Sequence, residues 1–206
     1  MRKFILLPIL LMTCVAIAGC KSGAKDATPT TGNLDCKTAI QTYLDTADMK
    51  GRGEKEITKG NNIVVDYVGR LSDQEVFDTS VESVAQACGK YQAGRDYTGG
   101  LAFQVGAGQM IAGFDQGVEG MKLGQTKTIT IPAKDAYGEW SKDKLVAINK
   151  AKVPEADKYT VGTMVQTDYG QVFKVYEITA TQIIFDANHE LAGKDLIFDI
   201  TVKEIK

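Results

Sequence analysis

The chain has 206 residues, of which 44% are hydrophobic and 24% are charged, and its formal net charge is −2. This length allows one ordinary domain, or one domain with a small second one, and the composition is that of a globular protein. A charge so close to zero gives no electrostatic reason to expect a nucleic-acid partner. No stretch after residue 20 is long and apolar enough to predict a membrane-spanning helix.

The first twenty residues have the pattern of an export signal. MRK is positively charged, FILLPILLMTCVAIA is a short apolar core, and Gly19-Cys20 follows it. The residues IAGC (17–20) resemble the bacterial lipoprotein processing box, in which the cysteine is acylated and becomes the new N-terminus. Ordinary signal cleavage after AIA (16–18) and retention as a membrane anchor are the alternatives. We therefore expect an exported protein, lipid-anchored through Cys20 to the extracytoplasmic face of a membrane, in the periplasm or at the cell surface.

The segment that follows the signal is polar, and it precedes two cysteines. KSGAKDATPTTGN (21–33) predicts a flexible tether. In an oxidising compartment Cys36 and Cys88 suggest a disulfide, although two buried, unpaired thiols would also fit. The chain has one histidine and no C-x-x-C or Cys/His ligand spacing. We therefore predict no metal site and no cofactor.

The next segments predict a helix, four strands and a second, short helix. Asp35 is expected to cap a helix that starts at Cys36, because apolar residues recur there at helical spacing. NIVVDYVGRL (62–71), VFDTS (76–80), LAFQVG (101–106) and QTKTITIP (125–132) read as strands, and residues 81–100 read as a long loop or flap. Before the last of these strands, Phe114, Val118 and Met121 predict a short helix with one buried face.

Residues 141–188 read as a separate, small all-β unit. TMVQT (163–167) and QVFKVYEIT (171–179) form a hairpin pattern, and QIIFDA (182–187) is a third strand. The polar stretch SKDKLVAINKAKVPEADKY (141–159) precedes them. LIFDITVKEI (196–205) then reads as a strand that closes the chain, so the unit is inserted between two strands of the larger domain.

Five motifs together resemble a known family. NIVVDYVGRL, VFDTS, LAFQVGAGQMIAGFDQGVEGMKLGQ, DAYG and LIFDITVKEI are similar, in this order, to the core of the FKBP family, the macrolide-binding peptidyl-prolyl isomerases. DANHELAGKDLIFDITV further resembles the SlyD branch, in which an inserted chaperone unit, the IF domain, splits the FKBP fold. The resemblance implies an α+β fold, with an antiparallel sheet wrapped around a short helix and a small all-β inserted domain.

The expected domain boundaries follow from these patterns. We expect a signal at 1–20, a tether and N-terminal helix at 21–56, an isomerase domain at 57–140 and 189–206, and the inserted domain at 141–188.

The resemblance also implies a proline-binding pocket. Catalytic roles fall on Tyr67, Phe77, Asp78 and Tyr137, and substrate-binding roles on Leu101, Met110, Ile111, Phe114 and Phe198. Phe114 stands where eukaryotic members usually have tryptophan, and Leu101 stands where an aromatic residue is usual, so macrolide binding is expected to be weak. From the residues alone, the alternative is that the aromatics are plain core, Asp78 a strand-end cap and Tyr137 a surface turn residue.

The inserted unit and its boundary suggest two further roles. Its aliphatic and aromatic residues exceed what so small a unit buries easily, which predicts a surface for unfolded chains at Met164, Val172, Phe173, Tyr176 and Ile184. The alternative is that they form only the unit's own core. His189, the single histidine, is expected to have a structural hydrogen-bonding role at the domain hinge, with a general base or metal ligand as the alternative.

These patterns together predict an isomerase and folding helper whose partners are unfolded or proline-containing polypeptides. A holdase with an inactive pocket and a surface adhesion or assembly lipoprotein that reuses the fold are the competing hypotheses.

Overall fold

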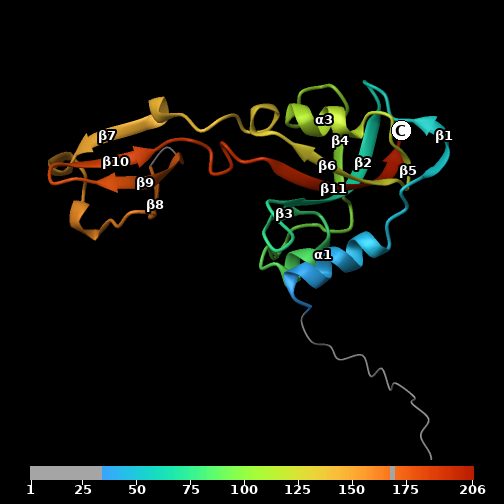
Figure 1. Cartoon of the computed structure of the whole chain (residues 1–206), viewed down its shortest axis with the longest axis horizontal. Helices are drawn as coiled ribbons and strands as arrows, with labels where there is room; N and C mark the ends of the chain where they lie inside the picture. The colour runs from blue at the N-terminus through green and yellow to red at the C-terminus, as the bar shows by residue number, and fades with distance from the viewer. Residues whose placement is uncertain (1–33, 168–169) are drawn as a thin grey trace, which may run out of the picture. The chain divides into compact units, whose positions relative to one another are not determined.

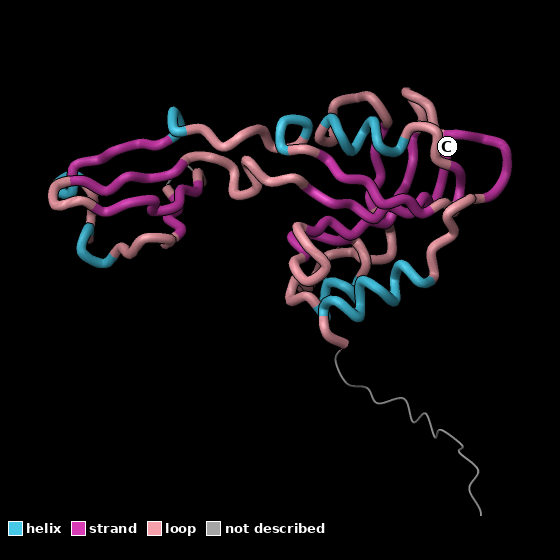
Figure 2. Tube along the Cα trace, viewed as in Figure 1, coloured by secondary structure: helices cyan, strands magenta, loops and turns pink. Residues whose placement is uncertain are grey.

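The computed structural model describes residues 34–167 and 170–206, and the predicted signal, Cys20 and the predicted tether lie outside these residues. Figures 1 and 2 show its helices and strands. In chain order they are α1 (Cys36–Asp45), β1 (Arg52–Glu56), β2 (Asn62–Arg70), β3 (Val76–Thr79), α2 (Glu82–Ala87), β4 (Leu101–Gln104), α3 (Ala112–Val118), β5 (Lys122–Leu123), β6 (Thr126–Ile131), β7 (Leu145–Asn149), β8 (Met164–Gln166), β9 (Val172–Ile178), β10 (Gln182–Asp186) and β11 (Leu196–Ile205). No helix in the described part combines the length and the hydropathy needed to cross a bilayer.

A five-stranded antiparallel sheet carries most of the predicted site. Its order is β3-β2-β11-β6, and β4 also pairs with β2. Residues 62–65 of β2 pair with β4 and residues 68–70 pair with β3, so two short strands share one edge of β2. The closing strand β11 lies between β2 and β6, although β6 precedes it by more than sixty residues. Few helices on an antiparallel sheet make the domain α+β, as predicted.

The short helix α3 packs closely on one face of this sheet (Figure 1). Gly113 and Gly117 lie one turn apart on α3 and face β6. A Cβ atom on them would come within 2.2 Å of Ile131 and 2.3 Å of Ile129, respectively. Such distances are far below van der Waals contact, so only glycine allows the helix to approach the strand this closely.

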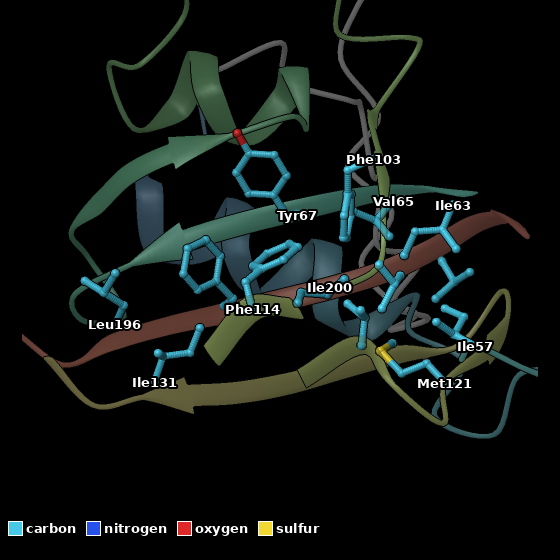
Figure 3. Close-up of a cluster of buried hydrophobic side chains, with 14 of the residues drawn as sticks. Ile57, Ile63, Val65, Tyr67, Phe103, Phe114, Met121, Ile131, Leu196 and Ile200 are labelled. Carbon is cyan, nitrogen blue, oxygen red and sulfur yellow. The ribbon is translucent and has the colours of Figure 1, made fainter. Parts of the chain in front are cut away.

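The main core fills the space between α3 and the sheet (Figure 3). In Figure 3, Ile57 and Met121 lie at the opposite end of this core from Ile131 and Leu196. Its buried members are Ile57, Ile63, Val65, Tyr67, Phe103, Val105, Phe114, Val118, Met121, Ile131, Leu191, Leu196, Phe198, Ile200 and Val202. Side chains of the long strands β2 and β11 enter this core at alternate positions, as the two-residue period of a strand requires.

The opposite face of the sheet is covered by α1 and α2. Ile40 of α1 and Val84 of α2 pack in one cluster with Val68 of β2. Cys36 and Cys88 form a disulfide with their Cα atoms 4.5 Å apart, which ties the start of α1 to the end of α2. This layer explains why β2 is buried on both faces rather than on one.

The helix predicted from Cys36 with Asp35 as its cap is present, whereas one other expectation was wrong and one strand was not predicted. Residues 81–100 do not form a loop throughout, because α2 occupies 82–87, where Val84 and Ala85 become fully buried. Residues 52–56, placed with the tether and helix, form β1, which pairs with β5. Glycines at 51 and 53 and four charged residues hid this strand, since Gly, Glu and Lys are depleted in strands.

The residues between β6 and β11 form a second antiparallel sheet, with the order β7-β10-β9-β8. The three strands expected here are present, but β7 was not predicted. Ile148 of β7 pairs with Ile183 of β10, and Val146 pairs with Phe185. The sequence LVAIN is short and lies between lysines, so its apolar residues gave no clear period. The hairpin turn at 168–169 lies outside the described residues.

Candidate active site

Four aromatic rings pack together in the main core, and three of their contacts are edge to face. The Phe114 ring lies 5.0 Å from the Phe198 ring and the Phe77 ring lies 5.4 Å from it, both nearly perpendicular. The Tyr67 ring is 6.3 Å from Phe114. These rings come from β2, β3, α3 and β11, so the fold gathers residues that are up to 131 positions apart (198 − 67). We call Tyr67, Phe77, Phe114 and Phe198 the aromatic cluster, and its perpendicular contacts are those that ring quadrupoles favour.

The residues predicted to border the aromatic cluster pack against the main core that contains three of its rings. Leu101 on β4 and Met110 and Ile111 before α3 are partly buried and pack against the main core. Ile111 also caps α3, and its carbonyl accepts hydrogen bonds from the N–H groups of Phe114 and Asp115, at 3.0 and 3.2 Å. Within the described residues, the N–H of Ile111 has no acceptor. It therefore remains available to a bound carbonyl group.

A polar network lies beside the aromatic cluster. The Tyr67 hydroxyl donates to the carboxylate of Asp78 on β3. The Arg95 guanidinium donates to the other oxygen of Asp78 at 2.7 Å and to the Tyr67 hydroxyl at 3.0 Å. Burial, followed by the bond to the Asp78 carboxylate, raises the pKa of Tyr67 well above its usual range. The hydrogen bond to Asp78 raises the pKa of Arg95 above its usual value. Tyr67 is therefore a neutral donor and Arg95 a cation at every physiological pH.

Backbone and hydroxyl contacts fix the position of Tyr67 on β2. Its N–H donates to the Ser80 hydroxyl at 2.9 Å, and the Thr79 hydroxyl donates to its carbonyl at 2.7 Å. Both partners follow Asp78 directly in the chain. These two hydrogen bonds hold the end of β3 against β2, next to the point where the Tyr67 hydroxyl contacts the Asp78 carboxylate.

Gly69 leaves the space that two rings of the aromatic cluster fill. A Cβ atom on this residue would lie 2.7 Å from the Phe77 ring and 2.9 Å from the Phe198 ring. A glycine within a strand often marks such a close approach, so the pattern YVGRL contained this signal. The sequence alone does not show which rings approach this glycine, because the position of neither ring follows from it.

Within the described residues, no hydrogen bond or ring contact joins Tyr137 to the other predicted catalytic residues. Its neighbour Ala136 packs against the main core, whereas Tyr137 is 38% exposed. Its ring stacks on His189, with centroids 3.8 Å apart and planes 1° from parallel. The sequence did not predict this stack, since the two residues are 52 positions apart (189 − 137). His189 also accepts a hydrogen bond at Nδ1 from the N–H of Leu191, at 3.2 Å, consistent with the structural role that we expected.

The residues predicted as a chaperone surface divide between the two faces of the second sheet. Met164, Val172 and Tyr176 are 53, 50 and 43% exposed. Ile184 is partly buried. Phe173 is also partly buried, and it packs against this sheet's own core. It pairs with Val165 and faces an apolar hollow of about 150 Å³, which is lined by Val146, Ile148, Val165, Thr167, Phe173 and Phe185.

The described residues contain no group of three or more His, Cys, Asp or Glu side chains placed to hold a metal ion. Arg95 is the residue near the aromatic cluster that sequence reasoning missed entirely. It lies in the irregular segment that links α2 to β4, where no periodicity assigns a side chain to either face. Only the folded segment brings it to Asp78.

An antiparallel sheet around one short helix, with an aromatic cluster between them, defines the class of FKBP-like domains. Residues 53–203 match the family model described as FKBP-type peptidyl-prolyl cis-trans isomerase. The chain is 37% identical over 150 residues to the short-type peptidyl-prolyl cis-trans isomerase of Methanocaldococcus jannaschii, covering 73% of this chain and 94% of that protein. It is 32% identical to SlyD of Escherichia coli, covering 52% of this chain and 56% of SlyD, and 32% identical to FK506-binding protein 1A of Neurospora crassa, covering 53% and 79%.

The chain therefore belongs to the family of FKBP-type peptidyl-prolyl cis-trans isomerases. It is an enzyme that acts on proline-containing polypeptides, as the sequence predicted.

Proposed function

We propose that this isomerase is an exported folding helper, anchored to a membrane by a lipid on Cys20. In this proposal the second sheet acts as an IF domain that binds unfolded chains, and the aromatic cluster isomerises their Xaa-Pro bonds. One observation supports this proposal most directly: the chain combines the aromatic cluster with a separate sheet, on which Met164, Val172 and Tyr176 are exposed. Exposed apolar side chains suit transient binding of unfolded segments, and methionine adapts to varied partners.

The reaction is a rotation, and its barrier comes from amide resonance. Twisting the Xaa-Pro bond breaks this resonance against a barrier of about 18–20 kcal/mol. The rotation breaks no covalent bond, so it requires no nucleophile. The twisted amide has a smaller dipole than the planar one and loses less on leaving water. An apolar site therefore binds the twisted state better than the planar state, and each ~1.4 kcal/mol of this difference gives a tenfold faster reaction.

The aromatic cluster supplies that apolar surface. Phe77, Phe114 and Phe198 hold the proline ring, with Met110 and Ile111 as the wall beside it. Phe77 is the partly buried ring, whereas Phe114 and Phe198 are buried, and the Phe198 ring contacts both of the others. Because each ring is held by perpendicular contacts, the surface is formed before the substrate arrives.

Hydrogen bonds orient the substrate chain on this surface. The N–H of Ile111 donates to a carbonyl next to the proline, and the hydroxyl of Tyr137 donates to the substrate carbonyl. Asp78, held by Tyr67 and Arg95, receives polar contacts at the edge. Fixing the flanking carbonyls while the Xaa-Pro bond rotates directs binding energy to the twisted state.

The same residues support weak binding of macrolides. Phe114 and Leu101 offer less aromatic surface than the tryptophan and aromatic residue usual at these positions in the family. A macrolide, being much larger than a proline ring, loses apolar contact area there, whereas a single proline ring does not need it.

The isomerase site is tested with a short Xaa-Pro peptide. We expect the wild-type protein to accelerate cis-trans exchange, and the double variant Phe77→Ala/Tyr137→Ala to lose at least about tenfold in kcat/KM, equivalent to ~1.4 kcal/mol of transition-state binding. NMR exchange spectroscopy measures both rates. No acceleration by correctly folded wild-type protein would contradict the proposed site.

The chaperone role of the second sheet is tested separately. The variant Met164→Ser/Val172→Ser/Tyr176→Ser removes the exposed apolar surface, and Gln166→Ser/Glu177→Ser/Gln182→Ser is a matched control at exposed polar positions of the same sheet. We expect the first variant to suppress aggregation of an unfolded protein about threefold less well, since less apolar area is offered, with peptide isomerisation unchanged in both. Equal chaperone activity in the two variants would remove the role of this surface.

A further inference from the structure

Tyr137 and His189 lie on the two segments that connect the sheets. Tyr137 follows β6 on the segment that leaves the five-stranded sheet, and His189 lies on the segment that returns to β11. Their rings stack in parallel at 3.8 Å. Within the described residues, the Tyr137 hydroxyl has no hydrogen-bond partner. The orientation of the Tyr137 ring therefore depends on its stack with His189.

His189 is itself held in place from its own segment. The N–H of Leu191 donates to its Nδ1 at 3.2 Å, and the N–H of Ala192 donates to its carbonyl at 2.9 Å. With Nδ1 as an acceptor, the neutral imidazole carries its proton on Nε2. The ring therefore cannot turn over without losing the bond to Leu191.

Hydrogen bonds on both sides of the stack join the two segments. The Asn188 side chain accepts from the N–H of Ser141 at 3.0 Å and donates to its carbonyl at 2.9 Å. The N–H of Gly193 donates to the carbonyl of Gly138 at 2.8 Å. These contacts place the histidine ring against Tyr137 independently of the stack, so His189 can act as a fixed support for a mobile partner.

We propose that His189 is a positioning residue, whose imidazole face holds the Tyr137 ring so that its hydroxyl meets the substrate carbonyl. This inference rests on the role given to Tyr137 under the proposed function. An unsupported tyrosine at an exposed position samples several rotamers, and only one of them directs the hydroxyl at the substrate. Aromatic pairs contribute enough to shift such an equilibrium by about 2- to 13-fold.

Two substitutions separate the stack from the hydrogen bond. His189→Phe keeps an aromatic face for Tyr137 and removes the acceptor for Leu191, whereas His189→Asn keeps an acceptor near the position of Nδ1 and removes the ring. We expect His189→Asn to lower kcat for a short Xaa-Pro peptide about fivefold, with KM changed less than about twofold. His189→Phe should remain within about twofold of the wild type.

Thermal unfolding gives the control for folding, because the two roles predict opposite orders. If the hydrogen bond to Leu191 stabilises the protein, His189→Phe has a lower Tm than His189→Asn and yet a higher isomerase activity. A histidine with a purely structural role would instead lower activity and Tm together.

The coupling to Tyr137 is tested in the variant Tyr137→Ala. We expect His189→Asn to have no further effect in this background, because the residue it positions is gone. Equal losses from His189→Phe and His189→Asn, or the same fivefold loss with and without Tyr137, would overturn the inference. If Tyr137→Ala lowers the activity of the enzyme and His189→Asn does not, this inference alone is overturned. If the wild-type protein is inactive, the proposed function is overturned together with it.

Discussion

Arg95 completes the polar network beside the aromatic cluster, to which β2 and β3 contribute only Tyr67 and Asp78. Tyr67 and Asp78 lie on paired strands, and their hydrogen bond follows from the register of β2 and β3. The carboxylate has a second oxygen, which the Arg95 guanidinium binds at 2.7 Å. Because the guanidinium also contacts the Tyr67 hydroxyl, one residue from an irregular segment holds both members of the pair.

The contribution of Arg95 can be measured by removing its charge. We expect Arg95→Met to lower kcat/KM for an Xaa-Pro peptide about threefold, a modest loss because the ion pair is partly exposed to solvent. Lys90→Met, at an exposed position of the same segment, is the control and should leave the rate unchanged. Equal rates for the two variants would mean that Asp78 keeps its orientation without Arg95.

At the level of elements, the candidate active site depends on two layers on opposite faces of one sheet. Gly113 and Gly117 allow α3 to approach β6, which holds Phe114 of α3 against Phe198 of β11. On the other face, α1 and α2 pack on Val68, the residue next to Tyr67. The disulfide Cys36–Cys88 ties these two helices, and α2 begins the segment that carries Arg95.

Removing the disulfide should therefore destabilise the protein measurably. We expect Cys36→Ser/Cys88→Ser to lower the free energy of unfolding by about 4 kcal/mol, because the cross-link restricts a long loop of the unfolded chain. Urea denaturation measures the difference. In a reducing agent the wild type should match the variant, and a loss below ~1 kcal/mol under oxidising conditions would show that the packing of α1 is sufficient without the cross-link.

At the level of the whole molecule, the proposal places folding catalysis beside a membrane. The two segments at the base of the second sheet enter and leave it close together, as the bonds between Ser141 and Asn188 require. This arrangement lets a complete sheet interrupt the larger domain without separating β6 from β11. In the proposed function, an unfolded chain bound to the second sheet is held on the same molecule as the aromatic cluster, which raises its effective concentration at that cluster.

Membrane anchoring is tested by changing the cysteine that would carry the lipid. We expect Cys20→Ser to move the protein from the membrane fraction to the soluble fraction, since a missing acyl chain removes its main attachment. Cys14→Ser, within the apolar part of the signal, is the matched control and should remain with the membrane. A Cys20→Ser protein that stays in the membrane fraction would indicate a retained span instead, and a soluble wild type would indicate ordinary cleavage.

The local sequence pattern was sufficient to predict the helices and strands whose own residues show which of their faces is buried. Alternation and β-branched residues predicted β2, β3, β4, β6 and β11, and helical spacing after Asp35 predicted α1. The pattern failed for β1, β5, β7 and α2. Each is short, and each is stabilised by a partner that comes from elsewhere in the chain, such as Ile183 for Ile148 of β7.

The sequence by itself determined the family, the fold class and the residues of the aromatic cluster, because five ordered motifs contain them in full. Only the tertiary structure brought Arg95 to Asp78, His189 to Tyr137 and Gly69 beneath two rings. These contacts join residues from separate elements, and their distances depend on how the elements pack. Periodicity assigns a side chain to a face of its own strand or helix, whereas packing decides which side chain it meets there.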